Sequence, residues 1–202
     1  MSHINYSYNF IFVRTPRTAS RSILNVLNKY QTEPISIKGY GFDFNHIPCK
    51  AIHEHYPDVY NSFFKFAIVR NPWCRMVSMW TMDHRYYKQV PSFNDYIKSL
   101  FDLNWLPSQG AHKQSPRDVW LNKNCNMYDF TKGVDFIGKF ENIQNDFKEI
   151  CKHVNLPVTY LPQFTQKHSR PHYSSYYDNE TRQIVAEKYA RDIEYFGYKF
   201  GD

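Results

Sequence analysis

The chain has 202 residues, 42% hydrophobic and 22% charged, with only 7 glycines and 11 prolines. This composition excludes collagen-like, disordered and low-complexity chains, and the length predicts a single domain over residues 1–202. Lysine and arginine outnumber aspartate and glutamate by 25 to 19, a formal net charge of +6, which favours an anionic partner. The charge alone does not distinguish a nucleic acid, a membrane surface and a small phosphorylated molecule.

Strand and helix patterns alternate along the chain, which is typical of a parallel α/β sheet. Residues 8–13 form a short β-prone run, and a helical pattern follows it as far as Tyr30. Residues 63–69 form a second apolar run, after which Asn71 is a helix cap and Pro72 the first residue of a long helix. Both runs are predicted to be buried central strands.

The same alternation continues in the second half of the chain. Residues 92–103 predict an amphipathic helix, residues 134–137 a strand, and residues 143–154 a further helix. A last helix is predicted from an Asp178 cap through Ile193, and the segment 162–177 before it is predicted to be a surface loop.

No stretch approaches the length of about eighteen apolar residues that a membrane helix requires, and no basic segment followed by an apolar run opens the chain. We therefore expect neither a membrane span nor a secretion signal. The cysteines at positions 49, 74, 125 and 151 form no CxxC pair, so a reducing cytosol with four free thiols is expected.

The first chemical motif is the turn at residues 14–22, which holds three arginines and four hydroxyl side chains. A helix N-terminus after a parallel strand favours an anion, and guanidinium and hydroxyl groups would complete a phosphate cradle. The alternative is a Ser- or Thr-capped helix with solvated arginines. The turn contains no glycine, so it does not match the GxxxxGK[ST] loop of ordinary P-loop nucleotidases.

The second motif, residues 69–78, repeats the strand-to-helix turn with Arg70 at the strand exit. An arginine stands where a nucleotidase typically has an acidic magnesium ligand, so we predict a second phosphate site without a metal. Ser78 would lie beside that anion, or would be a small packing residue. Along this helix, Trp73, Val77 and Trp80 are predicted to face inward, and Arg75, Ser78 and Met82 to lie on another face. Two cradles at strand ends imply a ligand with phosphates at two positions.

Both turns resemble motifs of carbohydrate sulfotransferases of the family 2, heparan/uronyl 2-O-sulfotransferase-like type. Residues 16–22, Pro-Arg-Thr-Ala-Ser-Arg-Ser, resemble the 5′-phosphosulfate loop, and residues 66–78, with Val-Arg-Asn-Pro and a later Ser, resemble the 3′-phosphate motif. Residues 136–142 and 177–198 are similar to later blocks of the family. The resemblance covers most of the chain and implies a P-loop-like, three-layer α/β domain with a central, mainly parallel sheet flanked by helices.

The resemblance implies 3′-phosphoadenosine 5′-phosphosulfate (PAPS) as donor, adenosine 3′,5′-bisphosphate as product, no metal, and a hydroxyl acceptor, first of all a carbohydrate. The positions it assigns to the donor's 5′ end are Arg14, Arg17, Thr18, Ala19, Ser20, Arg21 and Ser22. It assigns the 3′-phosphate to Arg70 and Ser78. Lys167 and Arg170 would close over the donor, or would be solvated charges of a loop.

Arg17 departs from the family pattern, which normally has lysine at this position. Arginine still offers a positive fork to the bridging oxygen, but it does not readily donate a proton. If charge stabilisation is sufficient, Arg17 is a catalytic residue. If a proton is required there, the chain is an inactive relative that binds the donor.

Sulfuryl transfer also needs a base beside the attacking hydroxyl. In position, His46 resembles the catalytic histidine of related carbohydrate enzymes. The alternative is a structural role, in which His46 closes a turn by hydrogen bonding. His53 and His55 are alternative bases. With Cys49 they suggest a metal site, but no fourth ligand is evident, so no metal site is predicted.

The sequence therefore predicts a sulfotransferase that uses in-line attack on sulfur, with His46 as base and Arg17 on the leaving group. A nucleotide-dependent kinase is disfavoured by the missing glycine loop and acidic metal ligand. A basic nucleic-acid-binding domain is disfavoured because the distinctive arginines lie at two turns instead of along one stripe. With no Golgi-type anchor visible, a cytoplasmic enzyme of bacterial or viral origin is expected.

Overall fold

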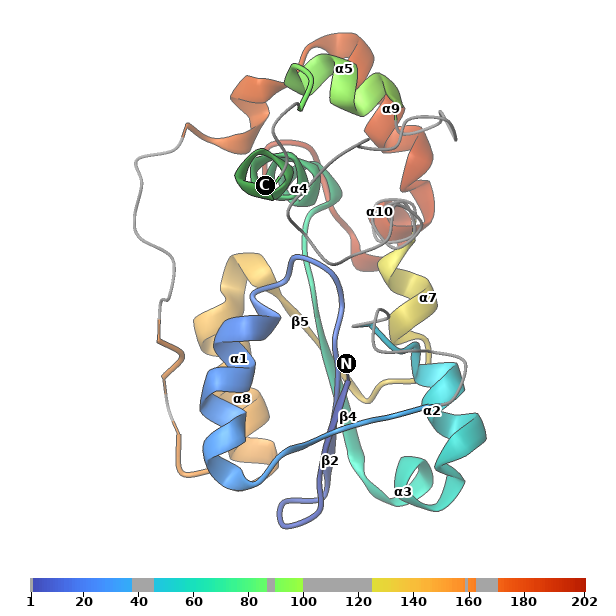
Figure 1. Ribbon diagram of the computed structural model, residues 1–202, viewed down its shortest axis with the longest axis vertical. Helices are drawn as coiled ribbons and strands as arrows, with labels where there is room; N and C mark the ends of the chain where they lie inside the picture. Colours follow the sequence, from blue (N-terminus) through green and yellow to red (C-terminus); the bar gives the residue numbers. More distant parts are fainter. Residues whose placement is uncertain (1, 38–45, 87–89, 100–124, 159, 163–170) are drawn as a thin grey trace. The chain divides into compact units, whose positions relative to one another are not determined.

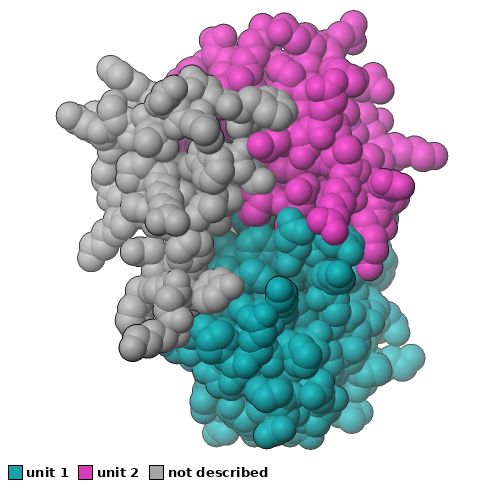
Figure 2. All heavy atoms as spheres, turned by 90° about the vertical axis from the view of Figure 1, so that its right-hand side faces the viewer, with its two compact units in different colours: residues 1–70, 127–167 teal, residues 71–126, 168–202 magenta. Residues whose placement is uncertain are grey.

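The computed structural model describes residues 2–37, 46–86, 90–99, 125–158, 160–162 and 171–202. The chain divides into two compact units, unit 1 (residues 1–70 and 127–167) and unit 2 (residues 71–126 and 168–202), which are coloured separately in Figure 2. Each unit is described by itself. The expectation of one domain over the whole chain stays a prediction.

Unit 1 contains a five-stranded sheet of order β3-β1-β2-β4-β5. Its strands are β1 (His3–Asn5), β2 (Phe10–Val13), β3 (Glu33–Pro34), β4 (Phe64–Val69) and β5 (Phe136–Lys139). β4 runs parallel to both β2 and β5, whereas β1 runs antiparallel to β2 and β3. The α/β prediction is confirmed, and so are the strands predicted at 8–13, 63–69 and 134–137, with their ends shifted by up to two residues. The antiparallel edge was not predicted, because strands of two or three residues are too short to show a periodic pattern.

Helices cover both faces of this sheet, as Figure 1 shows. The helices of unit 1 are α1 (Ser20–Leu27), α2 (Cys49–His55), α3 (Pro57–Ser62), α7 (Met127–Thr131) and α8 (Ile143–His153), with 3-10 turns η1 (Asn28–Tyr30) and η3 (Phe140–Asn142). Phe10 and Phe12 of β2 pack in one buried cluster with residues of α1 and α8, and Ile11 and Val13 pack in another with residues of α2. Period-two alternation thus places a core on each face of the strand.

Unit 2 is helical in its described part. Its elements are α4 (Pro72–Tyr86), α5 (Phe93–Lys98), η4 (Tyr173–Tyr176), α9 (Asn179–Lys188) and α10 (Ala190–Phe196). The predicted caps are confirmed: Asn71 Oδ1 accepts from the N–H of Trp73 at 3.1 Å, and Asp178 forms a capping box with Thr181. The predicted last helix is divided in two at Tyr189, where φ is −115°. Much of the predicted loop before it, residues 163–170, lies outside the described residues.

The burial of Arg75 was not predicted from the sequence. Its side chain is fully buried, with both Nη atoms donating to the Cys125 carbonyl oxygen at 3.2 Å and the guanidinium stacked 4.5 Å from the Tyr189 ring. Because α4 packs against α5, α9 and η4, more than one of its faces is covered. A guanidinium tolerates this burial when both Nη atoms are bonded and an aromatic ring covers its face, although Nε of Arg75 has no hydrogen-bond partner among the described residues.

None of the described helices has the length and apolar character that a membrane span needs. The four cysteines all lie in described segments, and no disulfide joins them.

We expect Arg75→Ala to lower the free energy of unfolding by about 3–5 kcal/mol, because it opens a cavity and leaves buried Asp192 without the charge that Arg75 places near it. Urea unfolding followed by circular dichroism measures this. The control is Arg85→Ala at an exposed position of the same helix, with an expected change of about 0.5 kcal/mol or less. Equal effects of the two variants would contradict the assigned role.

Candidate anion-binding site

The candidate site is built on the β2–α1 loop (residues 14–19), which is fastened to the neighbouring strand. The Thr15 hydroxyl donates to the Ile68 carbonyl oxygen of β4. Thr18 Oγ1 lies 2.9 Å from Thr15 Oγ1 and 3.0 Å from the Thr15 carbonyl oxygen, and both threonines are fully buried. The Thr18 hydroxyl, predicted to surround the donor, therefore takes part in bonds that shape the loop.

Two residues of the β2–α1 loop adopt a left-handed backbone. Arg17 has φ of 66° and Ala19 has φ of 57°, a backbone conformation that glycine adopts without steric cost. The loop thus has two left-handed residues without the glycines that normally permit this conformation. The left-handed conformation costs free energy at a non-glycine residue and needs support from neighbouring contacts.

Helix α1 begins in a way that favours an anion. Its N-cap is Ala19, which forms no side-chain cap, and its first turn contains no acidic residue. The Ala19 carbonyl accepts from the N–H groups of Ser22 at 2.9 Å and Ile23 at 3.2 Å. A Ser- or Thr-capped helix, the alternative considered for this turn, is therefore not what forms. The positive end of the helix dipole faces the loop without a carboxylate in its first turn.

Positive charge is concentrated around this helix start. Arg14 Nη2 donates to buried Ser20 Oγ at 3.3 Å. Arg21 and Ser22 both lie on α1; Arg21 is exposed and Ser22 is half-buried. Burial first, and repulsion by Arg21 second, lower the pKa of Arg14 to about 10. A guanidinium whose charged form is disfavoured in this way would gain from a bound anion, so these residues fit a phosphate group.

Arg70, predicted to bind a separate phosphate, lies against the same loop. Its Nη1 donates to the Arg17 carbonyl oxygen at 3.1 Å, its Cζ lies 3.9 Å from the centroid of the Phe140 ring, and its backbone N–H donates to Met127 Sδ at 3.3 Å. Because β2 and β4 are parallel neighbours, the residues that follow them leave the sheet at one edge. The two predicted cradles therefore adjoin at Arg70. Ser78 is half-buried on α4 in unit 2, and its role stays a prediction.

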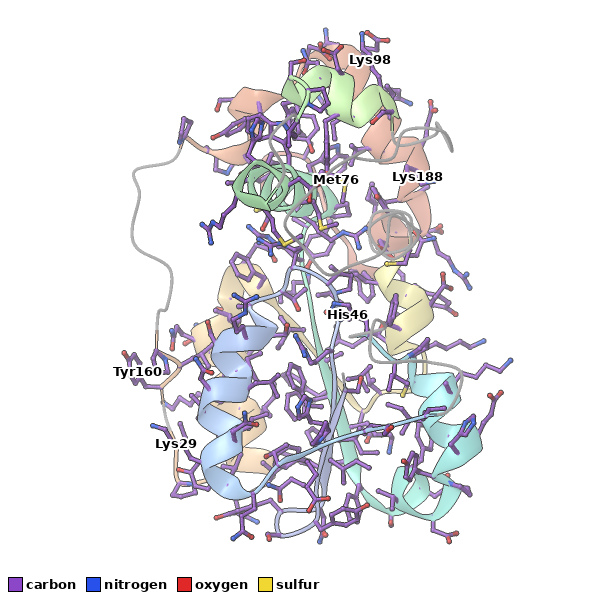
Figure 3. The ribbon with its side chains drawn as sticks, in the orientation of Figure 1. Lys29, His46, Met76, Lys98, Tyr160 and Lys188 are labelled. Carbon is purple, nitrogen blue, oxygen red and sulfur yellow. The ribbon has the colours of Figure 1, made fainter. Side chains whose placement is uncertain are left out.

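His46, the predicted base, precedes α2 in the chain and bonds through its side chain to the β2–α1 loop. It is labelled in Figure 3. Its Nδ1 lies 3.2 Å from the Arg14 carbonyl oxygen. A carbonyl only accepts, so Nδ1 carries the proton and Nε2 keeps its lone pair. The Phe130 ring packs edge-on beside the imidazole, with 6.3 Å between centroids.

Burial first, then the positive charges of Arg14 and Arg17, lower the pKa of His46 to about 3. The imidazole is therefore neutral at pH 7 and can accept a proton. It is a weak base as long as the arginine charges around it are not compensated by an anion.

The alternative bases lie on α2 with other partners. His53 and His55 are exposed; the His53 ring lies 4.5 Å from the Tyr60 ring, and His55 Nδ1 lies 3.0 Å from the Ala51 carbonyl oxygen. Of the three histidines, His46 is the one with a described bond to the loop. Within the described ranges, no group of three or more His, Cys, Asp or Glu side chains is placed to hold a metal ion.

Lys167 and Arg170, predicted to close over the donor, lie outside the described residues. The structure adds residues at the site that the sequence did not single out, namely Met127, Phe130 and Phe140. A signal existed for Phe140 alone: it directly follows β5, the parallel neighbour of β4, so it reaches the same sheet edge as Arg70. Together the described residues offer a cationic cradle beside a neutral imidazole, which suits anion binding with proton transfer.

A family model described as "Sulfotransferase family" matches residues 2–199 of the chain. An "Uncharacterized protein" of Archaeoglobus fulgidus is 28% identical to it over 100 residues, which are 49% of this chain and 73% of that protein. No solved structure gives a significant match.

We expect Ala19→Gly to raise the free energy of unfolding by about 0.5–1 kcal/mol, because relief of the left-handed backbone exceeds the added chain entropy of glycine. Thermal and urea unfolding measure this. Ala186→Gly, half-buried within α9, is the control and should lower stability by about 1 kcal/mol. A loss of stability in both variants would show that position 19 is not left-handed in solution.

Proposed function

The chain belongs to the sulfotransferase family, whose model matches residues 2–199, and we propose that it transfers a sulfuryl group from PAPS to a hydroxyl acceptor. The observation that carries this proposal is the cationic β2–α1 loop with neutral His46 bonded to its Arg14 carbonyl. An anionic donor and a proton acceptor are the two requirements of sulfuryl transfer. A P-loop-like architecture is part of the proposal, supported by the parallel β2–β4 pair and the loop between β2 and α1.

We assign the donor's 5′ end to the β2–α1 loop and the first turn of α1. Arg14, Arg17 and Arg21 supply the charge, while Ser20 and Ser22 stand at the helix start, where backbone N–H groups favour an anion. Arg70 and Ser78 would bind the 3′-phosphate, and Lys167 and Arg170 would close over the donor. The reaction needs no metal ion in this scheme, because side chains meet the phosphate charge.

In the proposed step, an acceptor oxygen attacks sulfur in line with the bridging oxygen of the donor. The new O–S bond forms as the S–O bond to the 5′-phosphate breaks, and the electron pair leaves with adenosine 3′,5′-bisphosphate. The acceptor's proton goes to His46 Nε2. This ring nitrogen has a free lone pair because the proton of the neutral ring is on Nδ1, which donates to the Arg14 carbonyl oxygen. Arg17 stabilises the charge that develops on the leaving oxygen.

The acceptor is proposed to be a carbohydrate, on the resemblance to the family 2 enzymes alone. A kinase and a nucleic-acid-binding domain are not favoured, since the family match supports sulfuryl transfer. A cytoplasmic location stays a prediction.

The proposal is tested by transfer of labelled sulfate from PAPS to a panel of saccharides in the presence of a metal chelator. We expect turnover by the natural protein, equal or faster turnover by Arg17→Lys, and a loss of about 10²-fold or more in turnover, with little loss of donor affinity, for Arg17→Ala. The reason is that charge develops on the bridging oxygen only in the transition state.

The outcomes of this test separate two claims. If the natural protein fails to bind adenosine 3′,5′-bisphosphate in calorimetry, the donor assignment is wrong. If Arg17→Ala turns over normally, the donor assignment stands and Arg17 has no part in the step.

For His46 we expect two linked results. Titration of the imidazole by NMR in the free protein should give a pKa well below 6.5, and adenosine 3′,5′-bisphosphate should raise this pKa, because phosphate charge offsets Arg14 and Arg17. His46→Asn should lower turnover by roughly 10²–10⁴-fold and leave affinity for the bisphosphate nearly unchanged.

His53→Asn and His55→Asn are the matched controls, because both histidines lie on α2 with partners outside the loop. They should keep full turnover. Loss of turnover in either control, with normal turnover of His46→Asn, would show that the base is a histidine of α2 and not His46.

A further inference from the structure

The side chain of Phe140 makes a contact that the proposed function does not require. Phe140 opens η3 directly after β5, and its ring centroid lies 3.9 Å from Cζ of Arg70. The same guanidinium donates from Nη1 to the carbonyl oxygen of Arg17 at 3.1 Å. One cation is therefore held by a ring from the end of β5 and by a backbone oxygen of the β2–α1 loop.

The Arg70 backbone is fixed as well. Its N–H donates to the sulfur of Met127, a residue with 1% exposure at the start of α7. Arg70 follows β4, and Ile68 of the same strand accepts the Thr15 hydroxyl bond. The loop thus has two attachments to this strand end, one through Thr15 and one through the Arg70 side chain.

The attachment through Arg70 matters because Arg17 has a left-handed backbone, with φ of 66°. A non-glycine residue keeps this conformation only where its surroundings hold it. A charged donor on the Arg17 carbonyl provides a strong hydrogen bond at that residue. The bond depends on where the guanidinium lies, and the Phe140 ring covers one of its faces.

We propose that Phe140 is a positioning residue: its ring holds the Arg70 guanidinium against the Arg17 carbonyl and thereby maintains the left-handed β2–α1 loop that receives the donor's 5′ end. A guanidinium has five N–H donors, and the bond to Arg17 uses one of them. Arg70 then serves both phosphate positions, directly at one and through the loop at the other. The ligand in this inference rests on the proposed function, whereas the effect on the loop does not.

Three variants isolate the ring. Phe140→Leu removes the aromatic face and keeps an apolar side chain, and Phe140→Tyr restores the face. Phe136→Leu is the matched control, because Phe136 lies on β5 and packs, like Phe140, partly buried against the same core cluster. A general loss of packing affects the two leucine variants alike.

The first measurement needs no ligand. Amide hydrogen exchange is followed at Ser22 and Ile23, whose N–H groups donate to the carbonyl of left-handed Ala19. We expect exchange at these two amides to be about three- to tenfold faster in Phe140→Leu, the range expected for loss of a cation–π contact. Phe140→Tyr and Phe136→Leu should exchange like the natural protein. Unchanged exchange in Phe140→Leu, or equally faster exchange in Phe136→Leu, would overturn the proposal.

The second measurement is calorimetric titration with adenosine 5′-monophosphate and adenosine 3′,5′-bisphosphate. Since the loop receives the 5′ end, Phe140→Leu should weaken binding of the monophosphate by a factor of about three to ten, and binding of the bisphosphate by at least as much, because Arg70 also binds the 3′-phosphate in this proposal. Loss of affinity for the bisphosphate alone would overturn the role in the loop and leave Phe140 with the 3′-phosphate only. If the natural protein binds neither nucleotide, the proposed function fails, and the exchange result still decides whether Phe140 positions the loop.

Discussion

The hydrogen bond from the Thr15 hydroxyl to the Ile68 carbonyl fastens the β2–α1 loop to the end of β4. The bond is possible because β2 and β4 are parallel neighbours whose carboxyl ends meet at one sheet edge. The hydroxyl groups of Thr15 and Thr18 are thus bonded within the protein. What the loop offers outward is charge and the start of α1. The separation of inner hydroxyls from outer arginines is the physical basis of the candidate site.

Charge crowding at this edge is costly to the free protein. Arg14 lies beside Arg21, and His46 lies beside Arg14; both side chains are half-buried, and the pKa values of both are lowered. Strongly shifted pKa values at a strand end are typical of functional sites, although ion-pair networks also produce them. Here the shifts come from burial and like charges, which a bound polyanion would offset. The same binding event would strengthen His46 as a base, so the affinity for an anion and the basicity of the histidine are physically coupled.

The sequence predicted what depends on local pattern. The apolar runs at 8–13 and 63–69 gave two buried strands, and Asn71 and Asp178 gave helix caps, because each signal lies within a few residues. It did not predict the short antiparallel edge or the burial of Arg75, which depend on contacts distant in the chain. The two phosphate cradles were predicted as separate, yet the Arg70 side chain bonds to the β2–α1 loop. This contact depends on which strands are neighbours in the sheet, and tertiary packing decides that order. The left-handed backbone at Ala19 was not predicted from the sequence either, because alanine rarely adopts this conformation.

The structure also bears on arginine at position 17, where the sequence resemblance leads one to expect lysine. The carbonyl of Arg17 accepts from Arg70, and a carbonyl does this whatever the side chain is, so exchange of arginine and lysine leaves that bond intact. Only the side-chain role at the leaving oxygen is affected. A phosphate monoester has a second pKa of about 6, so the proposed leaving group departs as a stable dianion near pH 7 without taking up a proton. Under the proposed chemistry, a group that stabilises charge suffices at this position, and the inability of arginine to donate a proton does not by itself preclude turnover.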